Sequence, residues 1–154
     1  MKDIVFVYPK PGIDFSPALP FPVLFPASTL VDNGFSVEII DERVLERKEF
    51  ITKLKKHANN DPIFFGISTM TGPQIRRALN AAEIVREENE STPIVWGGVH
   101  PSLLSEQTLQ DERVDIIVRG EGEITVLELA QKLEKNEKID SIDGISFKIN
   151  GEIR

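Results

Sequence analysis

The sequence predicts an α/β protein built on a doubly wound parallel sheet of five strands, and two observations carry this prediction. Short apolar runs without polar alternation recur along the chain, which is typical of strands buried on both faces. Between these runs lie segments whose apolar residues repeat at helical spacing. Strands that alternate with helices form parallel sheets with right-handed crossovers, so the helices are expected to cover both faces.

The apolar runs expected to form the strands are residues 4–8, 35–40, 62–67, 94–96 and 114–118. The second run follows Gly34, a residue type common just after a helix ends. Helical spacing of apolar residues is found in 50–58, 75–85 and 126–133. Thr71 and Gln74 have the spacing of a capping box, and Pro73 suits a first helical turn, so a helix is expected to start there.

The first helix is the least regular element of the prediction. It must lie between Phe21 and Asn33, and both Pro22 and Pro26 fall within that segment. A proline inside a helix removes one hydrogen bond and crowds the preceding turn. The sequence therefore predicts either a helix start near Pro26 or a kink at that residue.

The C-terminal residues predict a β-hairpin. Residues 144–149 would form its first strand, Asn150 and Gly151 suit a type I′ turn, and 152–154 would form the return strand. We therefore divide the chain into an α/β domain of residues 1–140 and a hairpin of 141–154 that begins the connection to a further domain. The alternative, a short frayed end, stays open.

Composition and charge exclude several functions. The chain has 154 residues, of which 40% are hydrophobic, enough for one domain with a core. Its net charge of −7 does not suit binding to nucleic acid or to anionic membranes. Without cysteine it cannot hold a disulfide or an iron–sulfur cluster within these residues. No segment is long enough to span a membrane and no signal peptide is evident, so a cytoplasmic location is expected.

The residues that follow the predicted strands mark a candidate ligand site. Ligands of open α/β sheets bind at the carboxyl ends of the strands, and glycines there let a ligand approach the backbone closely. The candidate site residues are Ser68, Thr69, Met70, Gly97, Gly98, Val99, His100, Arg119, Gly120 and Glu121. For His100 the alternative is a cap on a helix that begins near Pro101. For Glu121 it is a favourable position at a helix N-terminus.

Several familiar sites are missing from the sequence. No Gly-x-Gly-x-x-Gly follows the first predicted strand, and no phosphate-binding Gly-Lys-Ser/Thr occurs. A phosphoacceptor domain would need an aspartate where Ser68 stands. The chain also lacks the Gly-x-Ser-x-Gly of a nucleophile elbow. We therefore expect the chain by itself not to be catalytic.

Taken together, these segments resemble the cobalamin-binding domain at the N-terminus of many radical S-adenosylmethionine enzymes. The resemblance covers nearly the whole chain and rests on the order and spacing of 20–41, 66–70, 93–101, 115–123 and 142–153. It implies a flavodoxin-like, Rossmann-like sheet of strand order 2-1-3-4-5 with a C-terminal β-hairpin.

The resemblance implies that cobalamin lies over the strand ends, with Ser68 and Gly97-Gly98 lining a slot for its nucleotide tail. Met70 stands where the wider family has leucine. The family's cobalt-ligating histidine would fall within residues 9–20, where this chain has none. Cobalamin would therefore be base-off, without a protein histidine beneath the cobalt.

The resemblance also implies a larger enzyme. S-adenosylmethionine and a [4Fe-4S] cluster would belong to a radical domain that follows this chain, and some family members are methyltransferases. The alternative is a degenerate domain of the same fold, free of cofactor, that serves only in interactions.

Overall fold

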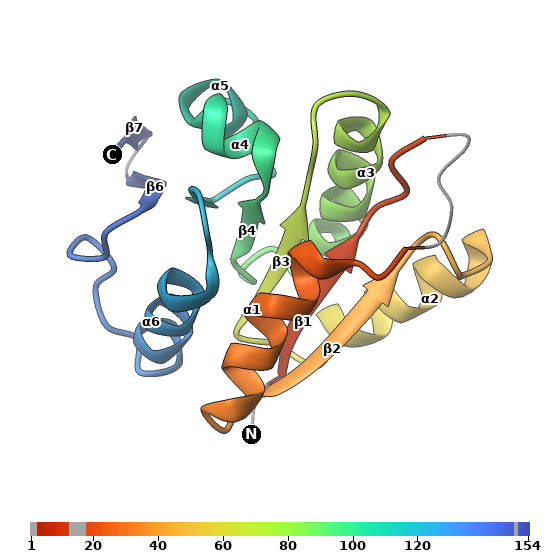
Figure 1. Ribbon diagram of the computed structural model, residues 1–154, viewed down its shortest axis with the longest axis horizontal. Helices are drawn as coiled ribbons and strands as arrows, with labels where there is room; N and C mark the ends of the chain where they lie inside the picture. Colours follow the sequence, from red (N-terminus) through yellow and green to blue (C-terminus); the bar gives the residue numbers. More distant parts are fainter. Residues whose placement is uncertain (1–2, 13–17, 150) are drawn as a thin grey trace.

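The computed structural model describes residues 3–12, 18–149 and 151–154. A single sheet runs through the molecule, with helices packed against both of its faces (Figure 1). The strands are β1 (Asp3–Tyr8), β2 (Ser36–Asp41), β3 (Phe64–Ser68), β4 (Ile94–Gly97), β5 (Ile116–Val118), β6 (Ile145–Ile149) and β7 (Glu152–Ile153). The helices are α1 (Phe21–Asp32), α2 (Arg47–Ala58), α3 (Pro73–Glu88), α4 (Val99–Leu103), α5 (Ser105–Leu109) and α6 (Glu123–Glu134).

The strand order is β2-β1-β3-β4-β5-β6-β7, and the first five strands in sequence are parallel. The predicted order 2-1-3-4-5 is therefore confirmed. The C-terminal hairpin is also confirmed, but it extends the same sheet, which has seven strands rather than five. β6 pairs antiparallel with β5 and so covers backbone groups that an edge strand would leave unpaired. The expected type I′ turn includes Asn150, which lies outside the described residues.

The two faces of the sheet carry separate parts of the core. α1 and α6 lie on one face, in front of the sheet in Figure 1, and α2 and α3 lie on the other. Alternate residues of each central strand therefore enter different clusters. On β1, Phe6 packs under α1 and α6, whereas Val5 and Val7 pack under α2 and α3. This burial on both sides explains why the strands are continuous apolar runs.

Helix α1 begins at Phe21, so the predicted start near Pro26 is wrong. Pro22 lies in the first turn, where backbone N–H groups have no hydrogen-bond partner within the helix, so the absence of an N–H costs nothing there. Pro26 lies inside the helix and is buried together with Val23, Ala27 and Leu30. Burial of this apolar face offsets the lost hydrogen bond, a tertiary effect that local rules do not capture. The kink at Pro26 stays a prediction.

The start of α3 also differs from the prediction, because Thr71 and Gln74 do not form a capping box. The N-cap residue is Gly72, without a side-chain cap. The Thr71 hydroxyl instead contacts His100 Nδ1 at 3.2 Å. The buried Gln74 amide donates to the carbonyl oxygen of Pro9 at 2.6 Å and accepts from the N–H of Met70 at 2.7 Å. Gln74 therefore joins the segments that follow β1 and β3.

The end of α1 agrees with the sequence. Gly34 has φ +88°, and its N–H donates to Val31 while that of Phe35 donates to Leu30, so the helix closes at the predicted glycine. Throughout the described part of the chain, no helix combines the length and the apolar character needed to cross a membrane.

Candidate ligand-binding site

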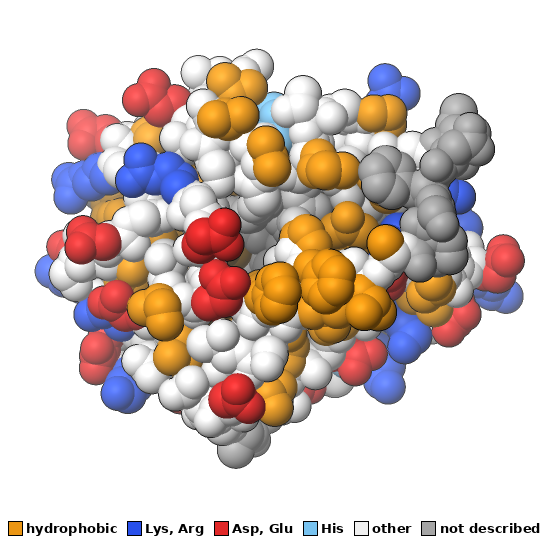
Figure 2. Space-filling model, in the orientation of Figure 1, with side chains coloured by type: hydrophobic (Ala, Val, Ile, Leu, Met, Phe, Trp, Pro, Cys, Tyr) orange, Lys and Arg blue, Asp and Glu red, His pale blue; other side chains and the backbone are white. Residues whose placement is uncertain are grey.

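A cavity of about 500 Å³ opens at the carboxyl edge of the sheet, on the face covered by α1 and α6. Figure 2 shows the surface hollowed between a hydrophobic patch over α1 and acidic side chains near the start of α6. Its walls come from β1, β3, β4 and β5, from the helices α1, α4 and α6, and from the loops after β4 and β5. The lining residues are Phe6, Phe21, Pro22, Val23, Phe25, Pro26, Phe64, Gly66, Ile67, Ser68, Val95, Gly97, Gly98, Val99, Ser102, Leu103, Val118, Gly120, Glu121, Gly122, Glu123 and Val126.

The strand register shows how far the cavity extends into the molecule. Ser68 lies opposite Gly97 at the edge of the sheet, and Gly66 lies opposite both Phe6 and Val95 further in. Phe64 also lines the cavity, four residues before Ser68 on β3. Four residues of an extended strand span about 13 Å. The cavity is therefore a slot between the sheet and the two helices rather than a shallow groove.

Gly66 sets the floor of this slot. A Cβ atom on Gly66 would lie 2.5 Å from Cε1 of the Phe6 ring. Real Cβ atoms do not come so close, so only glycine allows the ring to lie against the backbone of β3. The sequence analysis did not name Gly66 as a site residue, although a glycine inside an apolar strand is a signal for such a close approach.

Gly97 and Gly98 differ in how much space their surroundings leave for a side chain. A Cβ on Gly97 would meet one protein atom, the carbonyl oxygen of Val118 at 3.8 Å, and would otherwise occupy open space in the slot. Gly98 has φ +99°, and a Cβ there would lie 2.6 Å from the carbonyl oxygen of Thr69. The backbone of Gly98 is held close to β3 because His100 N–H donates to that same oxygen at 3.2 Å. The fold needs Gly98, whereas Gly97 leaves the slot open.

Ser102 joins two of the glycine-containing loops. Its hydroxyl donates to the carbonyl oxygen of Gly98 at 2.7 Å and accepts from the N–H of Gly120 at 2.9 Å. The exits of β4 and β5 are thereby fixed relative to each other. The sequence analysis missed Ser102, because only the tertiary structure brings Gly98 and Gly120 together.

The structure places the sequence-predicted site residues in two groups. Ser68, Gly97, Gly98, Val99, Gly120 and Glu121 line the slot, whereas Thr69, Met70, His100 and Arg119 do not. Thr69 follows the last residue of β3 and is fully buried. Met70 is partly exposed at the edge. The Arg119 guanidinium donates to the carbonyl oxygen of Ile145 at 3.3 Å, which ties it to β6.

His100 is buried within α4 and does not cap it, because the N-cap residue is Gly98. The helix-capping alternative is therefore wrong. Burial lowers the pKa of His100 below its ordinary value, which favours the neutral imidazole. The other histidine, His57, lies on α2, across the sheet from the slot. Neither histidine of the chain lines the slot, and the described residues contain no cluster of three or more metal-ligating side chains.

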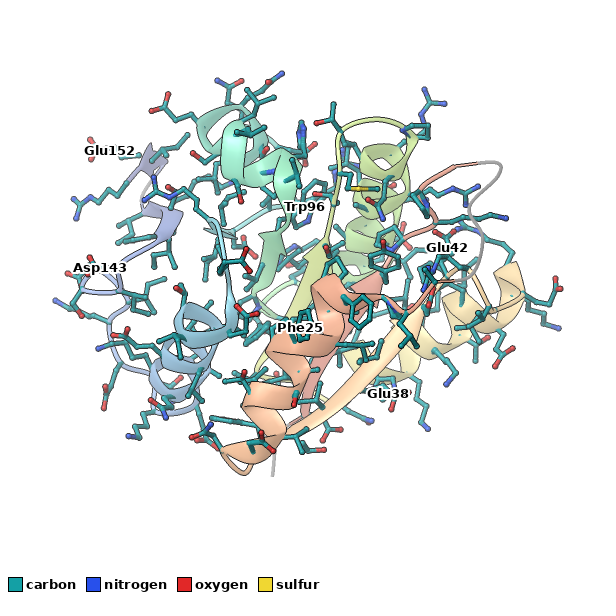
Figure 3. The ribbon with its side chains drawn as sticks, in the orientation of Figure 1. Phe25, Glu38, Glu42, Trp96, Asp143 and Glu152 are labelled. Atoms are coloured by element: carbon teal, nitrogen blue, oxygen red, sulfur yellow. The ribbon has the colours of Figure 1, made fainter. Side chains whose placement is uncertain are left out.

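Two aromatic residues of α1 were missed by the sequence analysis. Phe21 and Phe25 stack with ring centroids 5.3 Å apart, and both line the mouth of the slot. They are 49% and 56% exposed, unusual for phenylalanines that only build a core. Figure 3 shows Phe25 on α1, in front of the sheet. The spacing of four residues between them was visible in the sequence. The sequence did not show that they border a cavity.

The slot suits a ligand that has both apolar and polar groups. Its interior is apolar, and its polar groups, Ser68, Ser102, Glu121 and Glu123, belong to residues at the strand exits. Such a combination of an apolar pocket and a few polar groups is typical of cofactor sites.

The comparison with protein families agrees with this geometry. The family model for the B12 binding domain matches residues 17–130, which include the ends of β2, β3, β4 and β5. The chain belongs to the B12-binding domain family.

Curated relatives of this B12-binding domain are longer proteins. It is 34% identical over 128 residues to an uncharacterized methyltransferase, PH0819, of Pyrococcus horikoshii, which covers 82% of this chain and 28% of the relative. It is 30% identical over 138 residues to the anaerobic magnesium-protoporphyrin IX monomethyl ester cyclase of Synechocystis sp., covering 87% of this chain and 27% of the cyclase. The domain thus spans less than a third of these relatives.

Solved structures of similar fold are also larger. The radical S-adenosylmethionine methyltransferase TsrM from Kitasatospora setae, with tryptophan and an S-adenosylmethionine analogue bound, matches with a TM-score of 0.85 at 20% identity, over 99% of this chain and 29% of TsrM. The cobalamin-dependent S-adenosylmethionine radical enzyme OxsB, with aqua-cobalamin and S-adenosylmethionine bound, matches with a TM-score of 0.75 at 25% identity, over 100% of this chain and 22% of OxsB.

Proposed function

We propose that this domain binds cobalamin base-off, with the nucleotide tail in the slot between α1 and α6 and the corrin ring over the strand ends. The observation that carries the proposal is the open space above Gly97. A side chain there would fill the slot, and only the carbonyl oxygen of Val118 comes within 4 Å of its first atom. The depth of the slot, about 13 Å along β3, suits a nucleotide base and its ribose.

The residues at the strand exits suit the polar parts of this cofactor. The corrin ring carries amide side chains, which can donate to the carboxylates of Glu121 and Glu123. The stacked rings of Phe21 and Phe25 offer an apolar surface beside the slot. Ser68 offers a hydroxyl at the buried end of β3.

The distribution of histidines supports a cobalt without a protein imidazole beneath it. The sequence of residues 9–20 contains no histidine, and neither His57 nor His100 lines the slot. Bound cobalamin would supply a cobalt centre that can carry a methyl group. This chain would orient the cofactor and protect its tail from water.

We further propose that the exposed face of the cofactor is covered by a radical S-adenosylmethionine domain that follows this chain in the whole protein. Large apolar side chains gather around the mouth of the slot. Those that line the slot and are at least 49% exposed are Phe21, Phe25, Val99 and Leu103. Exposed apolar surface of this kind marks interaction sites. In this proposal the substrate, the S-adenosylmethionine and the [4Fe-4S] cluster belong to that further domain.

The test is retention of the cofactor by the purified chain. The protein is equilibrated with hydroxocobalamin, desalted, and its visible spectrum is recorded. Cobalamin that co-elutes with a base-off spectrum supports the proposal. Co-elution with a base-on spectrum would contradict the insertion of the tail.

The second candidate is a cofactor-free interaction domain of the same fold. The exposed apolar rim favours it, since such a rim would also serve a protein partner. Absence of retained cobalamin from a folded chain, together with an unchanged melting temperature at saturating hydroxocobalamin, would favour this candidate.

A further inference from the structure

We infer that the deep end of the slot selects the lower base of the cofactor, preferring a corrinoid with an apolar benzimidazole to one with a purine. This inference rests on the proposed function, because it concerns the tail that would enter the same slot. It is carried by the separation of polar and apolar groups along the depth of the slot.

The polar groups of the slot all belong to its mouth. Ser68 is the last residue of β3, Ser102 lies in α4, and Glu121 and Glu123 follow β5. A ribose, a phosphate and corrin amides, which belong to the upper part of the tail, would lie among these groups. Hydrogen bonds are therefore available where the tail enters.

The deep end has an apolar lining. Phe6, Gly66 and Val95 form one layer across three neighbouring strands, and Phe64 lies below them. The rings of Phe6 and Phe64 meet edge to face, with centroids 6.1 Å apart and an interplanar angle of 79°. Aromatic rings in this arrangement present faces and edges that suit another flat ring. Val126 of α6 lies on the opposite wall.

The backbone around this end offers few free hydrogen-bonding groups. β1, β3 and β4 are interior strands of the sheet, each paired on both sides, so their ladders use the N–H and C=O groups. Among the described residues, the buried side-chain atoms without a partner are His57 Nδ1, Thr69 Oγ1, Thr92 Oγ1 and Trp96 Nε1. None of these four residues lines the slot. Trp96 packs in the core on the other face of the sheet.

The chemistry of the two bases then decides the preference. The outer edge of dimethylbenzimidazole carries only C–H and methyl groups, which gain from burial among Phe6, Phe64 and Val126. The corresponding edge of adenine carries an amino group and ring nitrogens, which would lose water without gaining a partner. The imidazole nitrogen that can bind cobalt is common to both bases, so it does not affect the comparison.

The experiment compares three corrinoids by titration of the purified chain, followed by visible absorbance or calorimetry. They are cobalamin, the same corrinoid with adenine as lower base, and cobinamide, which lacks the lower nucleotide. We expect cobalamin to bind at least about tenfold more tightly than the adenine form, a difference of about 1.4 kcal/mol, and cobinamide to bind more weakly than cobalamin. Equal affinities for the two bases would overturn the inference and leave the proposed function standing.

Two further outcomes separate the inference from the proposed function. If cobinamide bound as tightly as cobalamin, the tail would not use the slot, so the selection would be refuted while corrinoid binding stood. If none of the three bound to a folded chain, the proposed function itself would fail, and the inference with it.

A matched pair of substitutions locates the selection. Val95→Thr places a hydroxyl at the deep end, beside Gly66, and is expected to reduce the preference for cobalamin at least about fivefold, the lower end of the cost of an unpaired buried polar group. Val7→Thr makes the same change in the core on the other face of the sheet, where Val7 is fully buried. It is expected to cost similar stability and to leave the preference unchanged. A preference that moved equally in both variants would refute the assignment to this end of the slot.

Discussion

Replacing Gly97 by valine tests the slot most directly, because stability and binding should change in opposite directions. Gly97 is the last residue of β4, and its Cβ would meet only the Val118 carbonyl oxygen at a comfortable 3.8 Å. Glycine within a strand is less favourable than a side-chain-bearing residue by roughly 0.5–1 kcal/mol. Gly97→Val should therefore leave the free energy of unfolding unchanged or raise it by up to about 1 kcal/mol. That gain corresponds to a melting temperature higher by roughly 2–4 °C for a chain of this size.

The same valine should weaken cobalamin binding. Its methyl groups would occupy the space between Ser68 and Val118 that the tail needs. Forcing extra atoms into a filled site costs roughly 1–3 kcal/mol, which corresponds to an affinity loss of about 5- to 150-fold. Thermal unfolding followed by circular dichroism gives the first quantity, and titration with hydroxocobalamin followed by visible absorbance gives the second.

Two controls accompany this variant. Ser36→Val introduces the same residue at the exposed amino end of β2, at the other edge of the sheet, and should affect neither quantity beyond about 0.5 kcal/mol. Gly98→Val should instead destabilise the fold by at least about 1–3 kcal/mol, since its Cβ would lie 2.6 Å from the Thr69 carbonyl oxygen. A stable Gly97→Val protein that binds hydroxocobalamin with wild-type affinity would refute the reasoning and place the tail elsewhere.

Three further predictions concern residues around the site. Gln74→Leu should lower the free energy of unfolding, measured in denaturant titrations, by roughly 2–4 kcal/mol, because it leaves the buried Pro9 carbonyl and Met70 N–H unpaired. A loss below about 0.5 kcal/mol would contradict this role of Gln74. Burial lowers the pKa of His100, so below about pH 6.5 the unfolded chain binds a proton that the folded chain does not. The melting temperature should therefore fall as the pH decreases through this window, and should fall less in His100→Gln; parallel curves would exclude His100 as the cause. Phe25→Ala should weaken cobalamin binding with less than about 0.5 kcal/mol change in stability, since the ring is 56% exposed, and unaltered affinity would remove Phe25 from the site.

Most of the fold could be predicted from residue patterns. Continuous apolar runs such as 4–8 indicated strands buried on both faces, and Gly34 marked the end of α1, which closes just before it. The rules for crossover connections predicted helices on both faces of the sheet, and the family resemblance implied the order of the parallel strands. Apolar runs, glycine positions and family motifs are all features of short stretches of sequence. They can be recognised without knowing which residues come into contact in the folded protein.

The errors in the prediction came from competition between local and tertiary interactions. Thr71 and Gln74 have capping-box spacing, but their side chains find partners in other segments, at His100 and Pro9. Pro26 should end a helix by local rules, yet the burial of its face keeps it within α1. The pairing of the hairpin strand β6 with β5 is likewise a tertiary contact, because it depends on where the exposed edge of β5 lies in the folded sheet.

By itself, the sequence determined the class of fold, the edge of the sheet at which a ligand would bind, and the absence of a histidine from residues 9–20. Only the tertiary structure decided which face of the sheet opens, how deep the slot is, and that Gly98 serves the backbone while Gly97 leaves space. The physical reason is that a strand's period of two places its residues on alternate faces, but which face is filled depends on helices distant in sequence. The slot is the space left between Phe6, Val95 and Val126. These residues come from three separate segments, so no single segment specifies that space.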